Sequence, residues 1–260
     1  MSIKQNLLIT GHTSFLGKTF MRNLQGYELI KYSRIQNKKD SLSFSEESLD
    51  DLMKIVENRS IKMCVHIANF KDKNQEYDTE KEIEFIAKLN SYGIKKIVYI
   101  SSYWVDILKL ANDEYVSHKL QIEHEIMNKF SYNILRVGDI FGSNDTRDKL
   151  IPYLLVNENQ SNIKLYGNPE NIIKPIHVND VCKVLNEIIT NKSSKNRTID
   201  LYSDAYSLEE FIKIFKESRN KKFSVEYKNM NNLNFEYKST SNEKTLIEND
   251  LKKQLFDLDS

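Results

Sequence analysis

Apolar residues recur along the chain in two alternating arrangements, short continuous runs and stripes at helical spacing. The short runs are at Asn6–Thr10, Tyr27–Ser33, Met63–Ala68, Lys96–Ser101, Tyr132–Val137, Ile163–Tyr166 and Thr198–Tyr202. Runs of this length, rich in β-branched and aromatic residues, are typical of buried strands. Between them, apolar residues recur three and four positions apart, which is typical of a helix with one buried face. The pattern therefore predicts strands alternating with helices.

The predicted helices share one feature, an apolar stripe along a single side. They cover the segment from Leu16 to Leu24, the segments around Ile55 and around Ile83–Ala87, and residues 115–130, 148–156, 178–190 and 208–219. Strands separated by such helices are joined by right-handed crossovers, which give a parallel sheet covered on both faces. The predicted fold class is therefore α/β, a doubly wound parallel sheet.

The C-terminal region departs from this alternation. Residues 220–242 are rich in Asn, Lys and Ser, with one strand-like stretch at Phe223–Tyr227. A last helix is predicted at Glu243–Leu255, so this region is expected to belong to a smaller part of the molecule.

Composition and charge exclude several classes of protein. The chain has 260 residues, 38 of them basic and 37 acidic, so no basic face for nucleic acid is expected. No apolar run approaches the roughly 18 residues of a membrane helix, and Leu7–Thr10 is too short for a signal peptide. The two cysteines, Cys64 and Cys182, predict neither a disulfide framework nor a metal site. We expect a cytoplasmic globular protein without a membrane or nucleic-acid partner.

The segment between the first strand and the first helix, Thr10–Gly17, reads T-G-H-T-S-F-L-G. A tight turn that points backbone N–H groups and a helix N-terminus at a pyrophosphate needs small residues at such places. Gly11 would allow the turn and Gly17 would allow close packing of the helix, whereas Ser14 stands where the usual motif has a glycine. The segment predicts a dinucleotide site; a strand–helix turn without a ligand is the alternative.

The end of the second strand bears on the type of dinucleotide. An acid there commonly accepts a hydrogen bond from the ribose 2′-hydroxyl of NAD. This strand instead ends in Ser33 and Arg34, and no acid follows before Asp40. Because a guanidinium suits a 2′-phosphate, NADP(H) is predicted in preference to NAD(H). The alternative is that Arg34 is an exposed loop charge.

Tyr115 and Lys119 lie four residues apart and so share one helix face. A phenol with a pKa of ~10 is a poor acid at neutral pH, and a nearby ammonium is expected to lower that value. Tyr115 could then pass a proton to a carbonyl oxygen. Other pairs with this spacing exist, at Tyr27/Lys31, Tyr77/Lys81 and Tyr92/Lys96, but only Tyr115 opens a helix just after a strand, where α/β sheets bind ligands.

The strand before that helix ends in Ser101 and Ser102. A hydroxyl there can hydrogen-bond a substrate carbonyl together with Tyr115, and Ser102, beyond the last apolar alternation, is preferred for this role.

Together these residues resemble the short-chain dehydrogenase/reductase superfamily, in particular its extended branch acting on nucleotide-linked sugars. Six segments match in order, at Thr10–Gly17, Val65–Asn69, Val98–Ser102, Tyr115–Lys119, Leu135–Gly142 and Ile176–Val181. The resemblance implies a Rossmann-type sheet and a catalytic set of Ser102, Tyr115 and Lys119. It implies cofactor contacts from Gly11, Thr13, Ser14, Phe15, Leu16, Gly17, Ser33, Arg34, Ala68, Asn69, Ser101, Tyr115, Lys119 and Val137.

The resemblance also implies a division of the chain. Residues 1–142, completed by 176–202, would form the dinucleotide-binding domain, and residues 143–175 with 203–260 a smaller substrate-binding part. Substrate contacts are expected from Ser102, Trp104, Lys149, Tyr166 and His177, with Arg147 a further candidate for the diphosphate. Core packing of Trp104 and a structural hydrogen bond of His177 are the alternatives. Relatives often dimerise through the helices that include the Tyr–Lys helix, so the resemblance leaves a homodimer open.

The reaction type follows from what the motifs lack. Sugar 4,6-dehydratases of this family carry an Asp-Glu pair directly after the catalytic hydroxyl residue, whereas Tyr103 and Trp104 follow Ser102 here. No cysteine lies near Ser102 or Tyr115, which disfavours epimerisation beside the ketone. The resemblance therefore implies NADPH-dependent reduction of the 4-keto group of a nucleotide-diphosphate 4-keto-6-deoxy sugar, for surface polysaccharide. The alternatives are a nucleotide-sugar 4-epimerase that retains NAD and a non-catalytic NADP-binding regulator.

Overall fold

The computed structural model of the chain describes residues 5–34, 40–106, 112–191, 196–228, 243–246 and 250–258. Its centre is one eight-stranded sheet with the strand order β14-β11-β6-β5-β4-β1-β2-β3, and every neighbouring pair is parallel. The strands are β1 (Gln5–Thr10), β2 (Tyr27–Tyr32), β3 (Ser43–Phe44), β4 (Met63–His66), β5 (Lys96–Ser102), β6 (Ser131–Val137), β11 (Arg197–Tyr202) and β14 (Glu243–Leu246). The predicted α/β fold with a Rossmann-type parallel sheet is confirmed.

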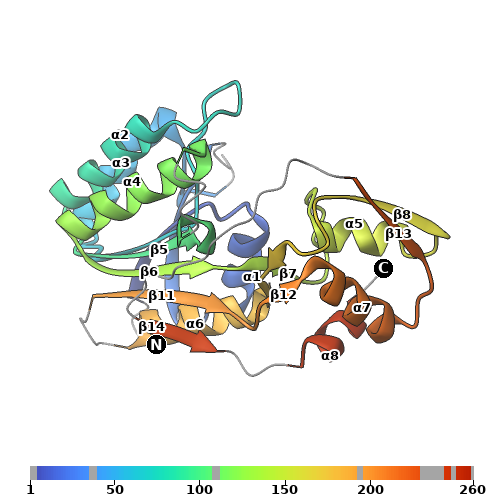
Figure 1. Cartoon of the computed structure of the whole chain (residues 1–260). Coiled ribbons are helices and arrows are strands. Elements are labelled where there is room, and N and C mark those ends of the chain that lie inside the picture. Colours follow the sequence, from blue (N-terminus) through green and yellow to red (C-terminus); the bar gives the residue numbers. More distant parts are fainter. Residues whose placement is uncertain are drawn as a thin grey trace.

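Helices cover both faces of this sheet, as Figure 1 shows. Three lie on one face, α2 (Leu49–Asn58), α3 (Thr79–Ser91) and α4 (Glu114–Lys129), and two lie on the other, α1 (Phe15–Asn23) and α6 (Val178–Thr190). Side chains of a strand alternate between the faces. In β1, Leu8 belongs to the core under the first three helices, whereas Leu7 and Ile9 belong to the core under the other two. The continuous apolar runs of the sequence thus reflect strands buried on both sides.

A smaller lobe lies beside the carboxyl end of the sheet (Figure 1). It contains α5 (Leu150–Asn157), α7 (Leu208–Arg219), α8 (Leu251–Phe256) and the parallel pair β8 (Asn162–Tyr166) and β13 (Ser224–Lys228). These elements share a separate apolar core that includes Leu154, Phe211 and Phe215. Short paired strands join the two lobes, namely β7 (Asp139–Phe141) with β10 (Pro175–His177), and β9 (Ile172–Ile173) with β12 (Tyr206–Ser207).

The helix predicted at Glu243–Leu255 is wrong in its first part. Glu243–Leu246 is strand β14, which pairs in parallel with β11, and a helix begins only at Leu251. The edge of β11 offers unpaired backbone groups to any neighbouring segment, and that partner lies far away in the sequence. Local pattern alone therefore could not identify this strand.

Two further features bear on the sequence analysis. Cys64 and Cys182 are both buried free thiols. Within the described part of the chain, no helix combines the length and the apolar character needed to cross a bilayer.

The carboxyl ends of β1, β4, β5 and β6 meet at one edge of the sheet. Thr10 is paired with His66, His66 with Tyr99, and Ser102 with Val137. The connections from β1 lead to one side and those from β4 to the other, and such a change of direction leaves a crevice above the strand ends. This edge faces the small lobe, so it is the expected place for a ligand.

Candidate active site

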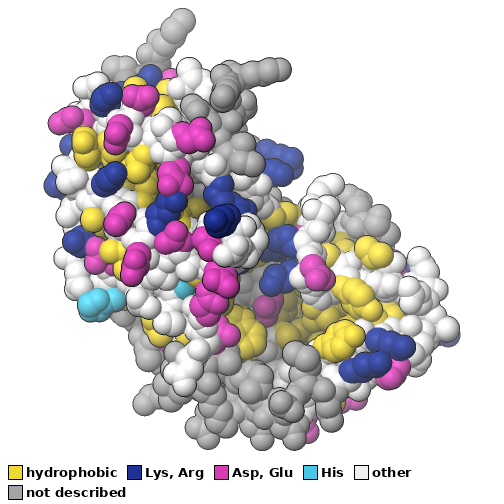
Figure 2. All heavy atoms as spheres, turned by 90° about the horizontal axis from the view of Figure 1, so that it is seen from above, with side chains coloured by type: hydrophobic (Ala, Val, Ile, Leu, Met, Phe, Trp, Pro, Cys, Tyr) yellow, Lys and Arg dark blue, Asp and Glu magenta, His cyan; other side chains and the backbone are white. Residues whose placement is uncertain are grey.

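A cavity of about 480 Å³ opens at this edge, between the sheet and the small lobe. Figure 2 shows the hollow between the lobes, with apolar side chains inside it and Lys and Arg side chains near its rim. The lining residues come from the ends of β5 and β6, from the segments that follow β1 and β4, and from the small lobe with the short strands that join it to the sheet. Among them are Ser14, Phe15, Leu16, Asn69, Tyr77, Ser101, Ser102, Trp104, Tyr115, Lys119, Val137, Asp139, Arg147, Lys149 and Ile173.

The loop before α1 requires both of its glycines. Gly11 has a φ of +69°, and a Cβ there would lie 2.7 Å from the backbone nitrogen of Ala68. A Cβ on Gly17 would lie 2.3 Å from the carbonyl oxygen of Gly11, so α1 packs directly against the turn. Ser14 caps α1, because its hydroxyl accepts a hydrogen bond from the Gly17 N–H at 3.1 Å. The loop thus brings a helix N-terminus to the cavity at close range, as a pyrophosphate site needs.

Replacing Gly17 by alanine is expected to weaken dinucleotide binding by about tenfold or more, because the added methyl group must push α1 away from the turn. Fluorescence titration with NADPH measures the Kd. Lys18→Ala, an exposed change on the same helix, is the matched control and should leave the Kd unchanged. A Gly17→Ala protein that binds within twofold of the unmodified chain contradicts this account of the loop.

The end of β4 completes the cradle for a dinucleotide. The Thr10 hydroxyl oxygen accepts hydrogen bonds from the N–H groups of Ile67 and Ala68, both at 3.2 Å, which fixes the strand end beside the glycine turn. Asn69 follows and lines the cavity, where its Oδ1 is buried without a hydrogen-bond partner. A buried amide oxygen of this kind is costly unless a ligand donor reaches it. The residues present therefore fit a dinucleotide.

Ser33 and Arg34 lie at the end of β2 rather than in the cavity wall. The Gly11 N–H donates to the Tyr32 carbonyl at 3.1 Å, which places this strand end next to the glycine turn. Arg34 is exposed and donates to the Gln75 side chain at 3.1 Å. Thr13 is also exposed, at the tip of the turn. The first acid after Arg34 in the sequence, Asp40, is paired with Lys31.

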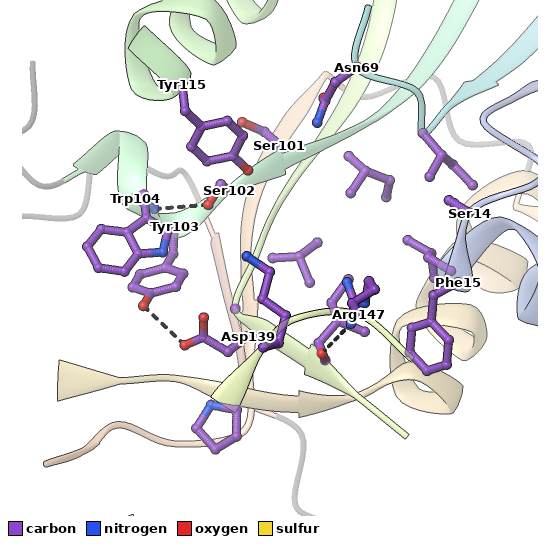
Figure 3. A pocket seen from close by; sticks show the side chains of 18 of the residues that line it. Ser14, Phe15, Asn69, Ser101, Ser102, Tyr103, Trp104, Tyr115, Asp139 and Arg147 are labelled. Atoms are coloured by element: carbon purple, nitrogen blue, oxygen red, sulfur yellow. Dashed lines mark hydrogen bonds between the residues drawn. The ribbon is translucent and has the colours of Figure 1, made fainter. Parts of the chain in front are cut away.

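Ser102, Tyr115 and Lys119 line the cavity, and Figure 3 shows Ser102 and Tyr115 next to each other at one end of it. Asp113 caps α4 by accepting a hydrogen bond from the Val116 N–H at 3.1 Å, so the helix begins just before Tyr115. Ser102 is the last residue of β5, and its hydroxyl oxygen accepts a hydrogen bond from the Trp104 N–H at 3.3 Å. The end of one strand and the start of one helix thus bring together residues that lie apart in the sequence.

The pKa of Tyr115 differs from the sequence-based prediction, which is wrong in its direction. Burial raises this pKa to about 12, and a hydrogen bond with Ser102 lowers it only in part. The ammonium of Lys119 lies 5.9 Å from the centre of the Tyr115 ring. Tyr115 therefore holds its proton across the neutral range.

Lys119 is buried beneath Tyr115. Its Nζ donates a hydrogen bond to the Ile100 carbonyl at 2.8 Å and lies 4.6 Å from the centre of the Tyr99 ring. Burial lowers the pKa of Lys119 to about 8, although the carboxylates of Glu82 and Glu123 act to raise it. The ammonium thus depends on nearby negative charge to stay protonated.

Ser101 lines the cavity, but its hydroxyl is engaged behind the site. Its hydroxyl donates to Glu123, and Glu123 accepts two hydrogen bonds from Arg136, at 3.1 and 2.6 Å. Arg136 also donates to Asp106 at 2.6 Å, at the end of the short 3-10 helix η2 (Tyr103–Asp106). This buried cluster ties β5, β6, α4 and η2 together behind the site.

The predicted substrate residues divide into two groups. Trp104 and Lys149 line the cavity, as does Arg147, whose guanidinium donates to the Ile140 carbonyl at 2.7 Å. Tyr166 does not line it: this side chain is 74% exposed at the end of β8. His177 does not line it either, because its ring caps α6 by accepting a hydrogen bond from the Asn179 N–H at 3.3 Å.

Tyr77 and Asp139 are among the lining residues that the sequence analysis did not assign to the site. Tyr77 precedes α3, and its ring centre lies 5.6 Å from that of Tyr115. Asp139 accepts hydrogen bonds from the Tyr103 hydroxyl at 3.1 Å and the Lys174 N–H at 3.0 Å, and burial raises its pKa. The position of Asp139 directly after the β6 strand end was a signal for it. The sequence contained no signal for Tyr77, because this residue reaches the cavity through a loop that folds back toward it.

Comparisons with known proteins agree with this architecture. The chain is similar to the solved structure of MoeE5 in complex with UDP-glucuronic acid and NAD, with 16% identity, a TM-score of 0.74 and 96% of each chain covered. It is also similar to UDP-N-acetylglucosamine 4-epimerase from Bacillus cereus, with 18% identity, a TM-score of 0.68 and 87% of this chain and 86% of that one covered.

A third similar structure is dTDP-glucose 4,6-dehydratase from Bacillus anthracis in complex with NAD, with 16% identity, a TM-score of 0.72 and 97% of this chain and 94% of that one covered. No curated protein sequence matches the chain. The model of the NAD dependent epimerase/dehydratase family matches residues 7–201. With the glycine turn, the strand ends and the Tyr–Lys helix all inside that match, the chain belongs to the NAD dependent epimerase/dehydratase family.

Proposed function

We propose that this protein reduces the 4-keto group of a nucleotide-diphosphate 4-keto-6-deoxy sugar with NADPH. The observation that carries the proposal is one cavity that brings together Ser102, Tyr115 and Lys119 and offers no acid–base pair beside them. Asp139 is the single carboxyl among the described lining residues. A dehydration needs an acid and a base to expel water, whereas a carbonyl reduction needs one proton donor.

The residues of the chain divide this work among them. The loop of Gly11 to Gly17 and the end of β4 would hold the dinucleotide, which supplies a hydride when bound. Ser102 would donate a hydrogen bond to the ketone oxygen, and Tyr115 would transfer its proton to that oxygen as negative charge develops there. Lys119, directly beneath, would stabilise the phenolate that remains on Tyr115.

The protonation state of Tyr115 supports reduction over epimerisation. A 4-epimerase must first remove a proton from a hydroxyl, so its tyrosine has to begin as the phenolate. Burial raises the pKa of Tyr115 to about 12, which favours the neutral phenol. A neutral phenol carries the proton that a reduction needs, but with a pKa this high it is a weak acid, so the transfer depends on Lys119 to stabilise the phenolate.

The small lobe supports a nucleotide-sugar substrate. Lys149 brings a cation to the cavity, and so does Arg147, which is paired with Asp145 at 2.7 Å; a diphosphate is the kind of group that such cations bind. Trp104, half-buried at the opposite wall, offers an apolar ring surface to a sugar. The solved structure of MoeE5 with UDP-glucuronic acid and NAD is an example of such ligands on this fold.

Arg34 supports NADPH as the reductant, since it follows the strand end beside the glycine turn. Replacing Arg34 by alanine is expected to reduce the preference for NADPH over NADH by about tenfold or more, the value of one charge-assisted hydrogen bond. Kinetics with both cofactors measure the ratio of kcat/KM. Arg22→Ala, an exposed change at the end of α1, serves as control, and an unchanged ratio in Arg34→Ala argues against this contact.

The proposed function is tested by following NADPH oxidation at 340 nm with a panel of dTDP-, CDP-, GDP- and UDP-linked 4-keto-6-deoxy sugars. The expected result is stoichiometric oxidation with one member of the panel and none without a sugar. Retention of NAD through purification, together with interconversion of 4-hydroxy sugars and no net oxidation, would identify a 4-epimerase instead. Dinucleotide binding without turnover of any sugar would identify a regulator.

A further inference from the structure

A carboxyl group lines the cavity opposite Ser102, and none of the steps above uses it. It belongs to Asp139, the first residue of β7, two positions after Val137. Val137 is the partner of Ser102 in the sheet. Neighbouring strands lie about 4.8 Å apart, and a strand rises about 3.3 Å per residue. Ser102 and Asp139 therefore lie within about the span of one sugar ring with its hydroxyl groups, and Figure 3 shows them on facing sides of the same space.

The two oxygens of this carboxyl have different surroundings. Oδ2 accepts hydrogen bonds from the Tyr103 hydroxyl at 3.1 Å and from the Lys174 N–H at 3.0 Å. Oδ1 has no hydrogen-bond partner among the residues that the structure describes, yet it is not sealed off in the protein interior. Figure 3 shows it turned away from Tyr103 and toward Ser102. Oδ1 is therefore the atom that Asp139 offers to a ligand.

Main-chain contacts hold Asp139 in place. Its N–H donates to the Lys174 carbonyl at 2.7 Å, so the same residue binds both the backbone and the side chain of Asp139. A Cβ on the preceding residue, Gly138, would lie 2.1 Å from that carbonyl oxygen, which shows how closely the two segments pack. A polar group fixed in this way has one direction in which to bind a ligand, and such groups determine specificity in ligand pockets.

A hydroxyl suits Oδ1 in either protonation state of Asp139. Burial raises the pKa of this carboxyl, whereas the hydrogen bonds from Lys174 and Tyr103 and the charges of Lys149 and Lys174 oppose that rise. The ionised carboxylate only accepts hydrogen bonds, and the protonated form holds its hydrogen on Oδ1, because Oδ2 already accepts two. A sugar hydroxyl can both donate and accept. A methylene group can do neither, and it would leave Oδ1 without water and without a partner.

The proposed function places the substrate relative to Oδ1. The ketone oxygen, on C4 of the sugar, would lie between the hydroxyl groups of Ser102 and Tyr115. Of the two carbons beside C4, C5 bears the methyl group C6 and no hydroxyl, whereas C3 can bear one. The hydroxyl closest to the ketone is therefore the one on C3, and it can reach across from Ser102 to Asp139. The opposite orientation would turn the C6 methyl group toward Oδ1 and leave the carboxyl unpaired.

We propose that Asp139 is a specificity-determining residue whose Oδ1 binds the C3 hydroxyl of the sugar, so that the substrate is a 4-keto-6-deoxy sugar with a free hydroxyl at C3. The 3-deoxy counterpart is then a poor substrate. The inference rests on the proposed function, because the contact of the ketone with Ser102 and Tyr115 determines which hydroxyl faces Asp139.

The first test compares two sugars that carry the same nucleotide, a 4-keto-6-deoxy sugar and its 4-keto-3,6-dideoxy counterpart, in the assay of NADPH oxidation. The two differ only in the C3 hydroxyl. We expect the unmodified chain to prefer the 3-hydroxy sugar by about 10- to 100-fold in kcat/KM, the range for a hydrogen bond to a charged group. Equal kcat/KM values for the two sugars overturn the proposal, and this comparison needs no variant to fold.

Asp139→Asn changes the atom that faces the substrate with little change in shape. The amide oxygen must take the place of Oδ2, which accepts two hydrogen bonds, so the NH₂ group takes the place of Oδ1. The preference for the 3-hydroxy sugar is expected to fall by about tenfold, mainly through a lower kcat/KM for that sugar. Asp204→Asn removes an exposed carboxylate before β12 and should leave the preference unchanged. An equal loss with both sugars in Asp139→Asn would assign Asp139 a structural role and contradict the proposal.

A binding measurement separates this inference from the proposed function. Isothermal titration calorimetry with the two sugars in the presence of NADP⁺, which cannot supply a hydride, gives both Kd values without turnover. We expect the same preference in Kd, reduced by about tenfold in Asp139→Asn. If neither sugar is reduced but this pattern of binding is found, the proposed function fails and the role of Asp139 stands. Equal Kd values, or no binding of either sugar, overturn the inference.

Discussion

Replacing Tyr115 by phenylalanine is expected to lower kcat by about 10³-fold or more, while the Kd for NADPH changes less than about threefold. The phenyl ring fills the same volume beside Tyr77 and Ser102, so the cavity keeps its shape. The variant lacks the hydroxyl whose proton the ketone oxygen must receive. Among the described side chains of the cavity, no other phenol lies at this position. Initial rates of NADPH oxidation and fluorescence titration measure the two quantities.

The matched control for this variant is Tyr92→Phe. Tyr92 and Lys96 have the same four-residue spacing, but Tyr92 is 39% exposed at the end of α3 and lies outside the cavity. Loss of the Tyr92 hydroxyl should leave kcat within twofold of the value for the unmodified chain. A Tyr115→Phe protein that retains a tenth of the original turnover would show that Tyr115 is not the proton donor.

Replacing Arg136 by methionine is expected to lower the free energy of unfolding by about 3–5 kcal/mol. Its guanidinium lies 2.6 Å from both Glu123 and Asp106, and all three side chains are almost fully buried. Methionine fills much of the space but leaves two carboxylates without a counter-charge, and that uncompensated burial is the main cost. Urea denaturation followed by circular dichroism measures the change.

An exposed ion pair provides the comparison for Arg136. Arg59 pairs with Glu28, but both side chains remain partly exposed, at 34% and 45%. Arg59→Met should therefore cost less than about 1 kcal/mol, because solvent screens such pairs. If the two variants lose similar amounts, the buried cluster does not hold η2 and α4 in the way described.

The fold was predictable because its signals are periodic and local. Leu7, Leu8 and Ile9 form an unbroken apolar run, which a strand buried on both faces requires, and α6 shows its stripe clearly. Strand β14 was not predictable, because its identity depends on the open edge of β11 rather than on its own residues. The very short strands, such as β7 and β10, are likewise defined by their partners.

The candidate site was predictable where order along the chain carries the information. Parallel strands end at one edge, so residues at the ends of neighbouring strands, such as Ser102 and Val137, converge there. The electrostatics were not predictable in the same way. The position of Lys119 after Tyr115 is visible in the sequence, but the burial that raises the pKa of Tyr115 comes from the tertiary packing.

The buried contacts of Glu82, which lies 3.0 Å from His66 Nε2 and 3.3 Å from His118 Nε2, show the same limit. His66, Glu82 and His118 are far apart in the sequence and belong to three different elements, β4, α3 and α4. Each residue alone reads as an ordinary polar side chain, and only the packing of the two helices on the sheet joins them. Tyr77 reaches the cavity for a comparable reason, through a loop that folds back toward it.

Transfer of deuterium from NADPH labelled at the nicotinamide C4 to a 4-keto-6-deoxy nucleotide sugar tests the central claim most directly. Mass spectrometry and NMR of the product should find one deuterium, at the sugar C4, for each NADPH oxidised, with the solvent supplying the hydroxyl proton. A product that forms without deuterium, or a sugar that changes configuration while the cofactor is neither consumed nor labelled, would contradict the reductase account.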